Sequence, residues 1–307
     1  MSGAAARRPP GALRLRARDP GRGDAGRPRE SDHVALAAVS KRPLPDPPPT
    51  RGRENLEAVL FDYGHTLIHF DDRPHEQLIE AYEKINQLLA ERLEREIPAA
   101  QVLIEKVSRA VDDEIQRDYA AGREEEVEIA GLYDSALRGL GLELQPALIE
   151  QVMELEQNGW LKSVHPGPDV VPTLEALKAA GLRLGIVSNA AYLPRLMLGQ
   201  LAALGLREFF DAVTFSSGVG VRKPHPAIYQ DALTKLAVGP SAALFVGDRV
   251  REDVEGPKRL GMRAVLTREW RQEDDPGVAD FVIERLGELS PIVARLRSGR
   301  PTPDTYN

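Results

Sequence analysis

Short apolar runs alternate with segments of helical periodicity along most of the chain. The first run, AVLF at residues 58–61, leads directly to Asp62. Similar runs occupy residues 182–189, 211–217, 242–248, 262–267 and 280–283, and most are separated by helix-periodic segments. Apolar runs of this length, bounded by turn residues, are typical of buried strands, and strands that alternate with helices form a parallel sheet. We therefore expect an α/β fold with helices on both faces of a parallel sheet.

A long stretch after the first run has helical periodicity alone. Apolar residues recur three and four positions apart in four segments, which lie near residues 78–93, 102–119, 127–140 and 146–153. Pro98 and Gly122 mark two of the breaks between them. The pattern predicts an all-helical domain at residues 73–165, which interrupts an α/β core domain formed by residues 54–72 and 166–298. We call residues 73–165 the helical insert.

The two ends of the chain differ in composition from the rest. Residues 1–53 are rich in Arg, Pro and Gly, and they hold twelve basic side chains against five acidic ones. Such a segment buries too little apolar surface to offset the entropy of ordering it, so we expect a disordered tail. Residues 299–307 are expected to form a flexible C-terminal tail. The chain beyond residue 53 has a net charge of −14, which disfavours nucleic acid as its main partner.

Composition also excludes several kinds of chemistry. The chain has no cysteine, which rules out disulfides, thiolate zinc sites and cysteine nucleophiles. No apolar run approaches the ~20 residues needed to cross a bilayer. Hydrophobic residues make up 42% of the chain, which is enough for a packed core. We expect a cytoplasmic protein with no membrane partner, either a monomer or a homodimer.

Polar residues stand at the ends of several predicted strands. Asp62 follows the first strand, Ser188 and Asn189 end the second, and Asp248 ends a later one. Lys223 follows the run at residues 211–217 and comes just before a predicted helix. In an open parallel sheet, ligands bind beyond the carboxyl ends of the strands. These side chains are therefore expected to meet at one edge of the sheet.

This combination of side chains suits phosphoryl chemistry that depends on a metal ion. Asp62 and Asp248, with Asp253 five residues further on, offer the hard oxygen ligands that Mg²⁺ prefers. Ser188 supplies a hydrogen-bond donor and Lys223 a fixed positive charge for phosphoryl oxygens. A carboxylate beside such a cluster can attack phosphorus and form a covalent acyl phosphate. Asp62 is the candidate nucleophile.

The motifs that carry these residues resemble those of the haloacid dehalogenase superfamily, subfamily I. The four matching segments read LFDYGHTL at 60–67, GIVSNA at 185–190, GVRKPHPAIYQDAL at 220–233 and FVGDRVREDVEGPKRLGM at 245–262. The resemblance implies a Rossmann-like core domain, and the helical insert corresponds to the C1 cap of that superfamily.

The resemblance also implies roles for individual residues. Asp62 and Lys223 would be catalytic, and turnover would pass through an aspartyl-phosphate. The Mg²⁺ ion would be bound by Asp62, the backbone carbonyl of Gly64, Asp248 and Asp253. The substrate phosphate would be bound by Thr66, Ser188, Asn189 and Lys223.

Gly64 departs from the pattern of the phosphatases in this superfamily. The position two residues after their nucleophile usually holds a second Asp, which protonates the leaving group and later deprotonates water. A glycine cannot transfer a proton, and general acid–base help is worth ~10²–10⁴-fold. Three interpretations remain open. Another group such as His65 replaces the acid, the substrate has a good leaving group, or the protein binds phosphate without turning it over.

The function that the sequence favours is a Mg²⁺-dependent phosphomonoester hydrolase acting on a small phosphorylated metabolite. The first alternative is a metal-independent 2-haloacid dehalogenase, which uses the same Asp and Lys. Such enzymes generally lack the spacing of Asp248 and Asp253 that this chain has. The second alternative is a catalytically weak phosphate-binding or interaction protein.

Overall fold

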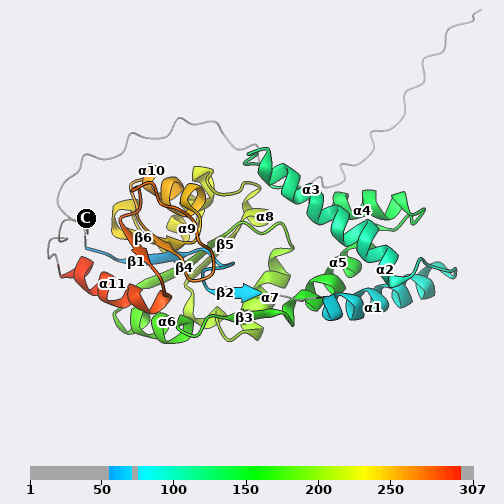
Figure 1. The fold of residues 1–307 in the computed structure, drawn as a ribbon, viewed down its shortest axis with the longest axis horizontal. Coiled ribbons are helices and arrows are strands. Elements are labelled where there is room, and N and C mark those ends of the chain that lie inside the picture. Colours follow the sequence, from blue (N-terminus) through cyan, green and yellow to red (C-terminus); the bar gives the residue numbers. More distant parts are fainter. Residues whose placement is uncertain (1–54, 71–74, 299–307) are drawn as a thin grey trace, which may run out of the picture. The chain divides into compact units, whose positions relative to one another are not determined.

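A computed structural model describes residues 55–70 and 75–298 of the chain. The tails expected at residues 1–53 and 299–307 lie outside the described residues. Within the described part, six parallel strands form one sheet in the order β5-β4-β1-β6-β7-β8. Figure 1 labels the first four strands of this order. The strands are β1 (Ala58–Phe61), β4 (Arg183–Ser188), β5 (Ala212–Phe215), β6 (Ala243–Gly247), β7 (Arg263–Thr267) and β8 (Phe281–Ile283). The predicted α/β fold with a parallel sheet is confirmed.

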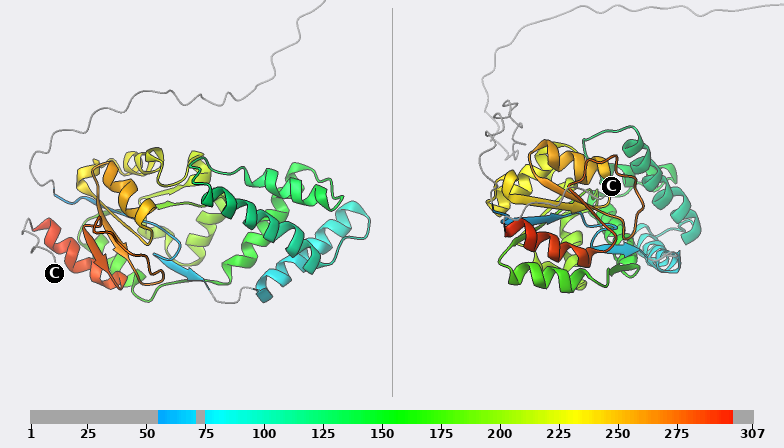
Figure 2. Two further views of the ribbon diagram at one scale, coloured as in Figure 1. Left: turned by 45° about the horizontal axis from the view of Figure 1, so that its top comes forward. Right: turned by 60° about the vertical axis from the view of Figure 1, so that its left-hand side comes forward.

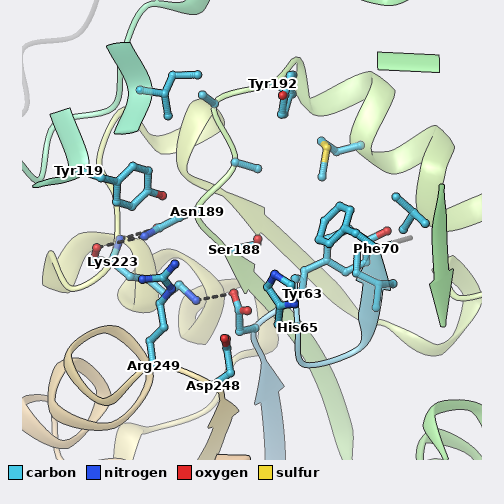
Figure 3. Close-up of a pocket in the computed structure, with 18 of the residues that line it drawn as sticks. Tyr63, His65, Phe70, Tyr119, Ser188, Asn189, Tyr192, Lys223, Asp248 and Arg249 are labelled. Atoms are coloured by element: carbon cyan, nitrogen blue, oxygen red, sulfur yellow. Dashed lines mark hydrogen bonds and ion pairs between the residues drawn. The ribbon is translucent and has the colours of Figure 1, made fainter. Parts of the chain in front are cut away.

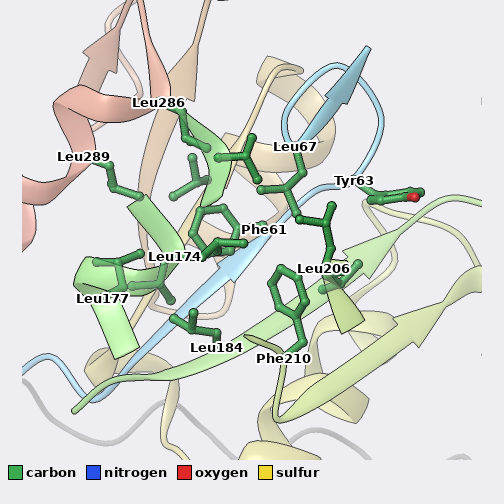
Figure 4. Close-up of a cluster of buried hydrophobic side chains, with 14 of the residues drawn as sticks. Phe61, Tyr63, Leu67, Leu174, Leu177, Leu184, Leu206, Phe210, Leu286 and Leu289 are labelled. Atoms are coloured by element: carbon green, nitrogen blue, oxygen red, sulfur yellow. The ribbon is translucent and has the colours of Figure 1, made fainter. Parts of the chain in front are cut away.

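Strand β1 is buried on both of its faces. Val59 and Phe61 point to one side, where they join a large apolar cluster (Figure 4). Ala58 and Leu60 point to the other side and join a second cluster. Successive side chains of a strand alternate between faces, so a run of four apolar residues requires cover on both sides of the sheet. This is why AVLF forms a central strand, with Asp62 held at its end.

Helices supply that cover, and Figure 2 shows them on both faces of the sheet. Helix α9 packs on the face of the second cluster, whereas α6, α7 and α11 pack on the face of the first. The bounds are α6 (Val170–Ala179), α7 (Pro194–Ala203), α9 (Pro226–Leu236) and α11 (Leu289–Arg297). Shorter helical turns are η2 (Arg207–Phe209), α8 (Ser216–Val219), η3 (Pro240–Ala242) and η5 (Leu286–Glu288). None of the helices in the described residues is long and apolar enough to span a bilayer.

The helices between β1 and β4 that precede α6 build a separate apolar cluster. They are α1 (His75–Leu93), α2 (Ala100–Leu103), η1 (Ile104–Ser108), α3 (Arg109–Ala120), α4 (Ile129–Gly139) and α5 (Pro146–Leu161). At its centre the buried carboxylate of Glu156 accepts hydrogen bonds from the hydroxyls of Tyr82, Ser108 and Tyr133. All six helices lie within residues 73–165, the range predicted for the helical insert. The boundaries of this domain stay a prediction.

Two features of the chain path were not predicted. A two-stranded antiparallel ribbon, β2 (Ile68–Phe70) with β3 (Val164–Pro166), lies at the two ends of the helical insert. The helical segment between β6 and β7 begins as a π-helix, η4 (Val250–Glu255), and continues as a short α-helix, α10 (Gly256–Arg259). The π-helix starts two residues after Asp248 and includes Asp253, so it sets how the two acids face each other.

Candidate active site

The carboxyl ends of β1, β4 and β6 open into one cavity of about 760 Å³. Asp62, Ser188 and Asp248 line it from the ends of these three strands, and Asn189 and Lys223 line it from the loops beside them. Figure 3 labels all of these except Asp62. These five residues are spread over almost 190 positions of sequence, and the parallel sheet places them together. The structure therefore brings these five side chains together at one edge of the sheet, as the sequence analysis expected.

Lys223 is the centre of the polar network. Its ammonium, on a side chain only 1% exposed, donates to Asp62 Oδ1 at 2.6 Å and to Asp253 Oδ1 at 2.7 Å. Burial lowers the pKa of Lys223, but the negative charges of Asp253 and Asp62 outweigh it and hold that pKa well above its ordinary value. The lysine is therefore charged at neutral pH and fixed between two carboxylates.

Asn189 fixes the loop that carries this lysine. The backbone N–H of Lys223 donates to Asn189 Oδ1 at 2.7 Å, and Asn189 Nδ2 donates to the Lys223 carbonyl at 3.2 Å. One N–H of the amide remains for a ligand. The hydroxyl of Ser188, in contrast, makes no hydrogen bond to the described residues, although its side chain lines the cavity.

Asp253 lies behind the cavity wall and uses both oxygens inside the protein. Oδ1 accepts from Lys223, and Oδ2 accepts from the backbone N–H groups of Asp248 and Arg249, each at 3.0 Å. Burial raises the pKa of Asp253 above its ordinary value, while the Lys223 charge opposes that rise. Burial, and then the Asp62 charge, raise the pKa of Asp248 to about 6. The cluster has more buried carboxylates than nearby cations can balance.

These residues fit a small divalent cation. Oxygen atoms of Asp62, Asp248 and Asp253 lie within 4.8 Å of one another, and all three residues are buried. Asp62 and Asp248 each use one oxygen, toward Lys223 and Arg271 respectively, and the other has no hydrogen-bonding partner among the described residues. Two free carboxylate oxygens at neighbouring strand ends are the hard ligands that Mg²⁺ takes. Both oxygens of Asp253 are engaged, which makes it the weaker candidate for direct binding.

The turn after Asp62 places its three candidate residues differently. Gly64 and His65 line the cavity, whereas Thr66 is buried and outside the wall, with no partner for its hydroxyl among the described residues. His65 has a left-handed backbone with φ of 59°, and its ring packs against Phe70 at 5.4 Å between centroids. Burial, and then the Arg271 charge, lower the pKa of His65. Thr66, predicted to bind phosphate, therefore does not line the cavity, whereas His65 does.

The sequence reasoning missed Arg249 and Arg271, which also line the cavity. Arg271 Nε donates to Asp248 Oδ2 at 2.5 Å from a segment 23 positions later in the chain. Its neighbour Trp270 stacks on His69 of β2, with ring centroids 4.2 Å apart. For Arg249 the sequence offers one indirect signal, its position directly after Asp248. For Arg271 it offers none, because the residue lies in a stretch without helical or strand periodicity.

Comparison with known families agrees with this geometry. The family model described as haloacid dehalogenase-like hydrolase matches residues 56–261, about two thirds of the chain. The chain belongs to the haloacid dehalogenase-like hydrolase family. The resemblance expected from the four motifs is thereby confirmed, and the protein is an enzyme of the hydrolase class.

Several members of this family are similar over most of the chain. A glyceraldehyde 3-phosphate phosphatase of Methanopyrus kandleri is 30% identical over 78% of this chain and 98% of its own length. A solved 2-haloacid dehalogenase of Pseudomonas syringae pv. Tomato matches 78% of this chain and 99% of its own, with 26% identity and a TM-score of 0.56. A solved phosphatase of the same family, from Thermococcus onnurineus, matches 78% of this chain and 98% of its own, with 26% identity and a TM-score of 0.52.

A buried ion pair links this hydrolase's helical insert to the loop of its central lysine. Arg222, whose side chain is 1% exposed, donates to Asp118 of α3, and its guanidinium lies 4.4 Å above the ring centre of Tyr119. Backbone hydrogen bonds join the same segments, from Arg222 N to Glu124 O at 2.7 Å and from Glu126 N to Gly220 O at 3.0 Å. Because Lys223 follows Arg222 directly, these contacts also hold the lysine loop against the helical insert.

Replacing Arg222 with Met is expected to lower the free energy of unfolding by about 3 kcal/mol, because Asp118 is left as a buried charge. The loss of stability should fall at the low end of the range usual for a broken buried ion pair, because Arg123, 3.0 Å from Asp118, still partly balances its charge. Urea unfolding checks this, with Arg138→Met as the control, since Arg138 pairs with Asp134 on the surface. A loss no larger than that of the control would contradict a stabilising role for the pair.

Proposed function

We propose that this enzyme hydrolyses a small phosphomonoester with Mg²⁺, through an aspartyl-phosphate on Asp62. The observation that carries the proposal is the arrangement around Lys223. One buried ammonium bridges Asp62 and Asp253, and the free oxygens of Asp62 and Asp248 remain for a divalent cation. A reaction that needed only Asp62 and Lys223 would gain nothing from two further buried acids beside them.

In the first step one carboxylate oxygen of Asp62 attacks phosphorus, and the bond from phosphorus to the leaving oxygen breaks. Lys223 keeps Asp62 ionised and aligned through its hydrogen bond to Oδ1. Ser188 and the remaining N–H of Asn189 bind phosphoryl oxygens. Bound Mg²⁺ supplies charge that neutralises the repulsion between the carboxylate and the phosphoryl group. It would be held by Asp62, Asp248 and the Gly64 carbonyl.

In the second step water attacks the phosphorus of the aspartyl-phosphate, releases inorganic phosphate and restores Asp62. The chain must dispose of one proton from this water and supply one to the leaving oxygen. Gly64 cannot do either, whereas His65 of the same turn lines the cavity and carries an imidazole that can transfer a proton. We assign His65 as the substitute. Asp253 acts indirectly, because it holds Lys223 and the backbone at Asp248 and Arg249.

The test is a phosphate-release assay on the full chain with p-nitrophenyl phosphate and a panel of small metabolite phosphates. We expect turnover with Mg²⁺ and a loss of at least about 10²-fold in EDTA, restored by excess Mg²⁺. Turnover that survives EDTA unchanged would contradict the metal dependence. Tight phosphate binding without any turnover would favour a binding protein.

A metal-independent dehalogenase is the second candidate, because the similar Pseudomonas protein carries that name and Gly64 lacks a proton-transfer group. The same sample can be given 2-chloropropionate with EDTA present. Release of chloride under these conditions, without phosphate release from the panel, would replace the phosphatase proposal. In either case we infer that the protein acts in the cytoplasm on a small molecule.

A further inference from the structure

Two helices of the helical insert present one face each to the cavity. Helix α3 contributes Asp112, Ile115, Gln116 and Tyr119, and α5 contributes Gln157 and Trp160. Residues three and four positions apart lie on the same side of a helix, so each set forms a continuous strip. We call these six residues the insert wall. The remaining described wall residues of the cavity come from the ends of the core strands and the loops that follow them, from β2, β3 and α7, and from η4, which contributes Glu252.

The insert wall contains buried hydrogen-bond donors without good acceptors. Gln157 is only 7% exposed, and its Nε2 donates to the thioether sulfur of Met197 at 3.2 Å. A thioether is a weak acceptor. The buried Nε1 of Trp160, one turn further on, has no partner among the described residues. An unsatisfied buried donor costs about 1–3 kcal/mol, so the unpartnered indole N–H of Trp160, three positions from an amide whose acceptor is only a thioether, indicates that a ligand supplies acceptors here.

The charges of the cavity are divided between its two sides. The cations of the described wall are Lys223, Arg249 and Arg271, and all three stand on the core side beside acids. The insert wall has no cation, and its one charged group is Asp112. Burial, and then the charges of Glu156 and Asp113, raise the pKa of Asp112 to about 6, so it is still mostly ionised at pH 7. Among the described residues of the insert wall, a carboxylate on this part of a substrate would meet an acid and no cation.

We propose that the insert wall recognises the non-phosphate part of the substrate, and that this part carries hydroxyl or carbonyl oxygens and no second acid group. The inference rests on the proposed phosphatase function and specifies its substrate class. The amide of Gln157 and the indole N–H of Trp160 donate to these oxygens, while Tyr119 and Gln116 offer further polar contacts. The insert wall, as far as the structure describes it, offers no cation to a second acid group, which disfavours carboxylated phosphates such as phosphoglycerate or phosphoserine.

The test compares two substrates that differ only in one group, glyceraldehyde 3-phosphate and 3-phosphoglycerate. We expect kcat/KM to favour the aldehyde by about 10²-fold, because the carboxylate meets Asp112 unpaired. Gln157→Lys places a cation in the wall and is expected to narrow this preference at least about 10-fold. Tyr119→Phe keeps the aromatic contact with Arg222 and is expected to raise KM for the aldehyde more than it lowers kcat.

Gln151→Leu is the matched control, since Gln151 lies on α5 outside the cavity and donates to the Ala147 carbonyl. It should leave the preference unchanged. If p-nitrophenyl phosphate is hydrolysed but 3-phosphoglycerate is preferred, or if Gln157→Lys and Tyr119→Phe behave like the control, the inference is wrong and the phosphatase function stands. No hydrolysis of any phosphate would overturn both.

Discussion

Replacing Asp62 with Asn is expected to lower kcat for phosphate release at least about 10³-fold, because the amide oxygen is a far weaker nucleophile than the carboxylate. Asn has nearly the same shape, so the hydrogen bond from Lys223 to position 62 can persist. The stability of the fold should not decrease, because the change removes one of three carboxylates that repel one another. Lys223 keeps its hydrogen bond to Asp253 at 2.7 Å. We therefore expect an unchanged or slightly higher melting temperature.

A steady-state assay and a melting curve on the same sample check this prediction. Asp134→Asn is the control, since Asp134 pairs with Arg138 on the surface of the helical insert. A rapid acid quench with labelled substrate should place the phosphoryl group on the peptide that contains Asp62, in the unsubstituted enzyme alone. Label on another peptide, or undiminished turnover by Asp62→Asn, would show that a different group attacks phosphorus.

The sheet could be predicted because its signal is local. AVLF at 58–61 and the later apolar runs are each too apolar to face water on either side, and the helices between them fix parallel connections. The ribbon of β2 and β3 could not be found in this way. Its strands have three residues each, carry His69 and His165, and pair across almost a hundred positions of sequence. Neither strand contains an alternation long enough to recognise.

In the candidate site, too, the residues with a local sequence signal could be predicted and the contacts between distant segments could not. Asp62, Ser188, Lys223 and Asp248 stand at strand ends or in motifs, so sequence placed them at one edge. The contacts that orient them depend on tertiary structure. The bridge from Lys223 to Asp253 requires a π-helix after residue 249, and the hydrogen bond from Arg271 to Asp248 requires a returning loop. No sequence period encodes either contact.

Gly64→Asp is expected to raise kcat about 10²-fold for substrates with alkyl leaving groups, because it restores an acid that can protonate the departing oxygen. The backbone has room for the side chain. Among the described residues, a Cβ at position 64 would meet only Phe70 Cε2, at 3.9 Å, and Gly64 does not have a positive φ. p-Nitrophenyl phosphate should gain little, since its leaving group needs no proton. Parallel assays of p-nitrophenyl phosphate and glycerol phosphate measure the difference.

Gly64→Asn is the control for shape, because it fills the same space and cannot transfer a proton. A gain by Asp but not Asn would show that proton transfer to the leaving group limits the natural enzyme, and that His65 replaces the missing acid only in part. Equal behaviour of the two variants would mean that the proton is already supplied. His65→Gln would then be expected to slow alkyl phosphates selectively, because His65 lies on the cavity wall next to position 64. If neither substitution distinguishes the two kinds of leaving group, the natural substrate leaves without protonation, as an acyl phosphate or sugar 1-phosphate would.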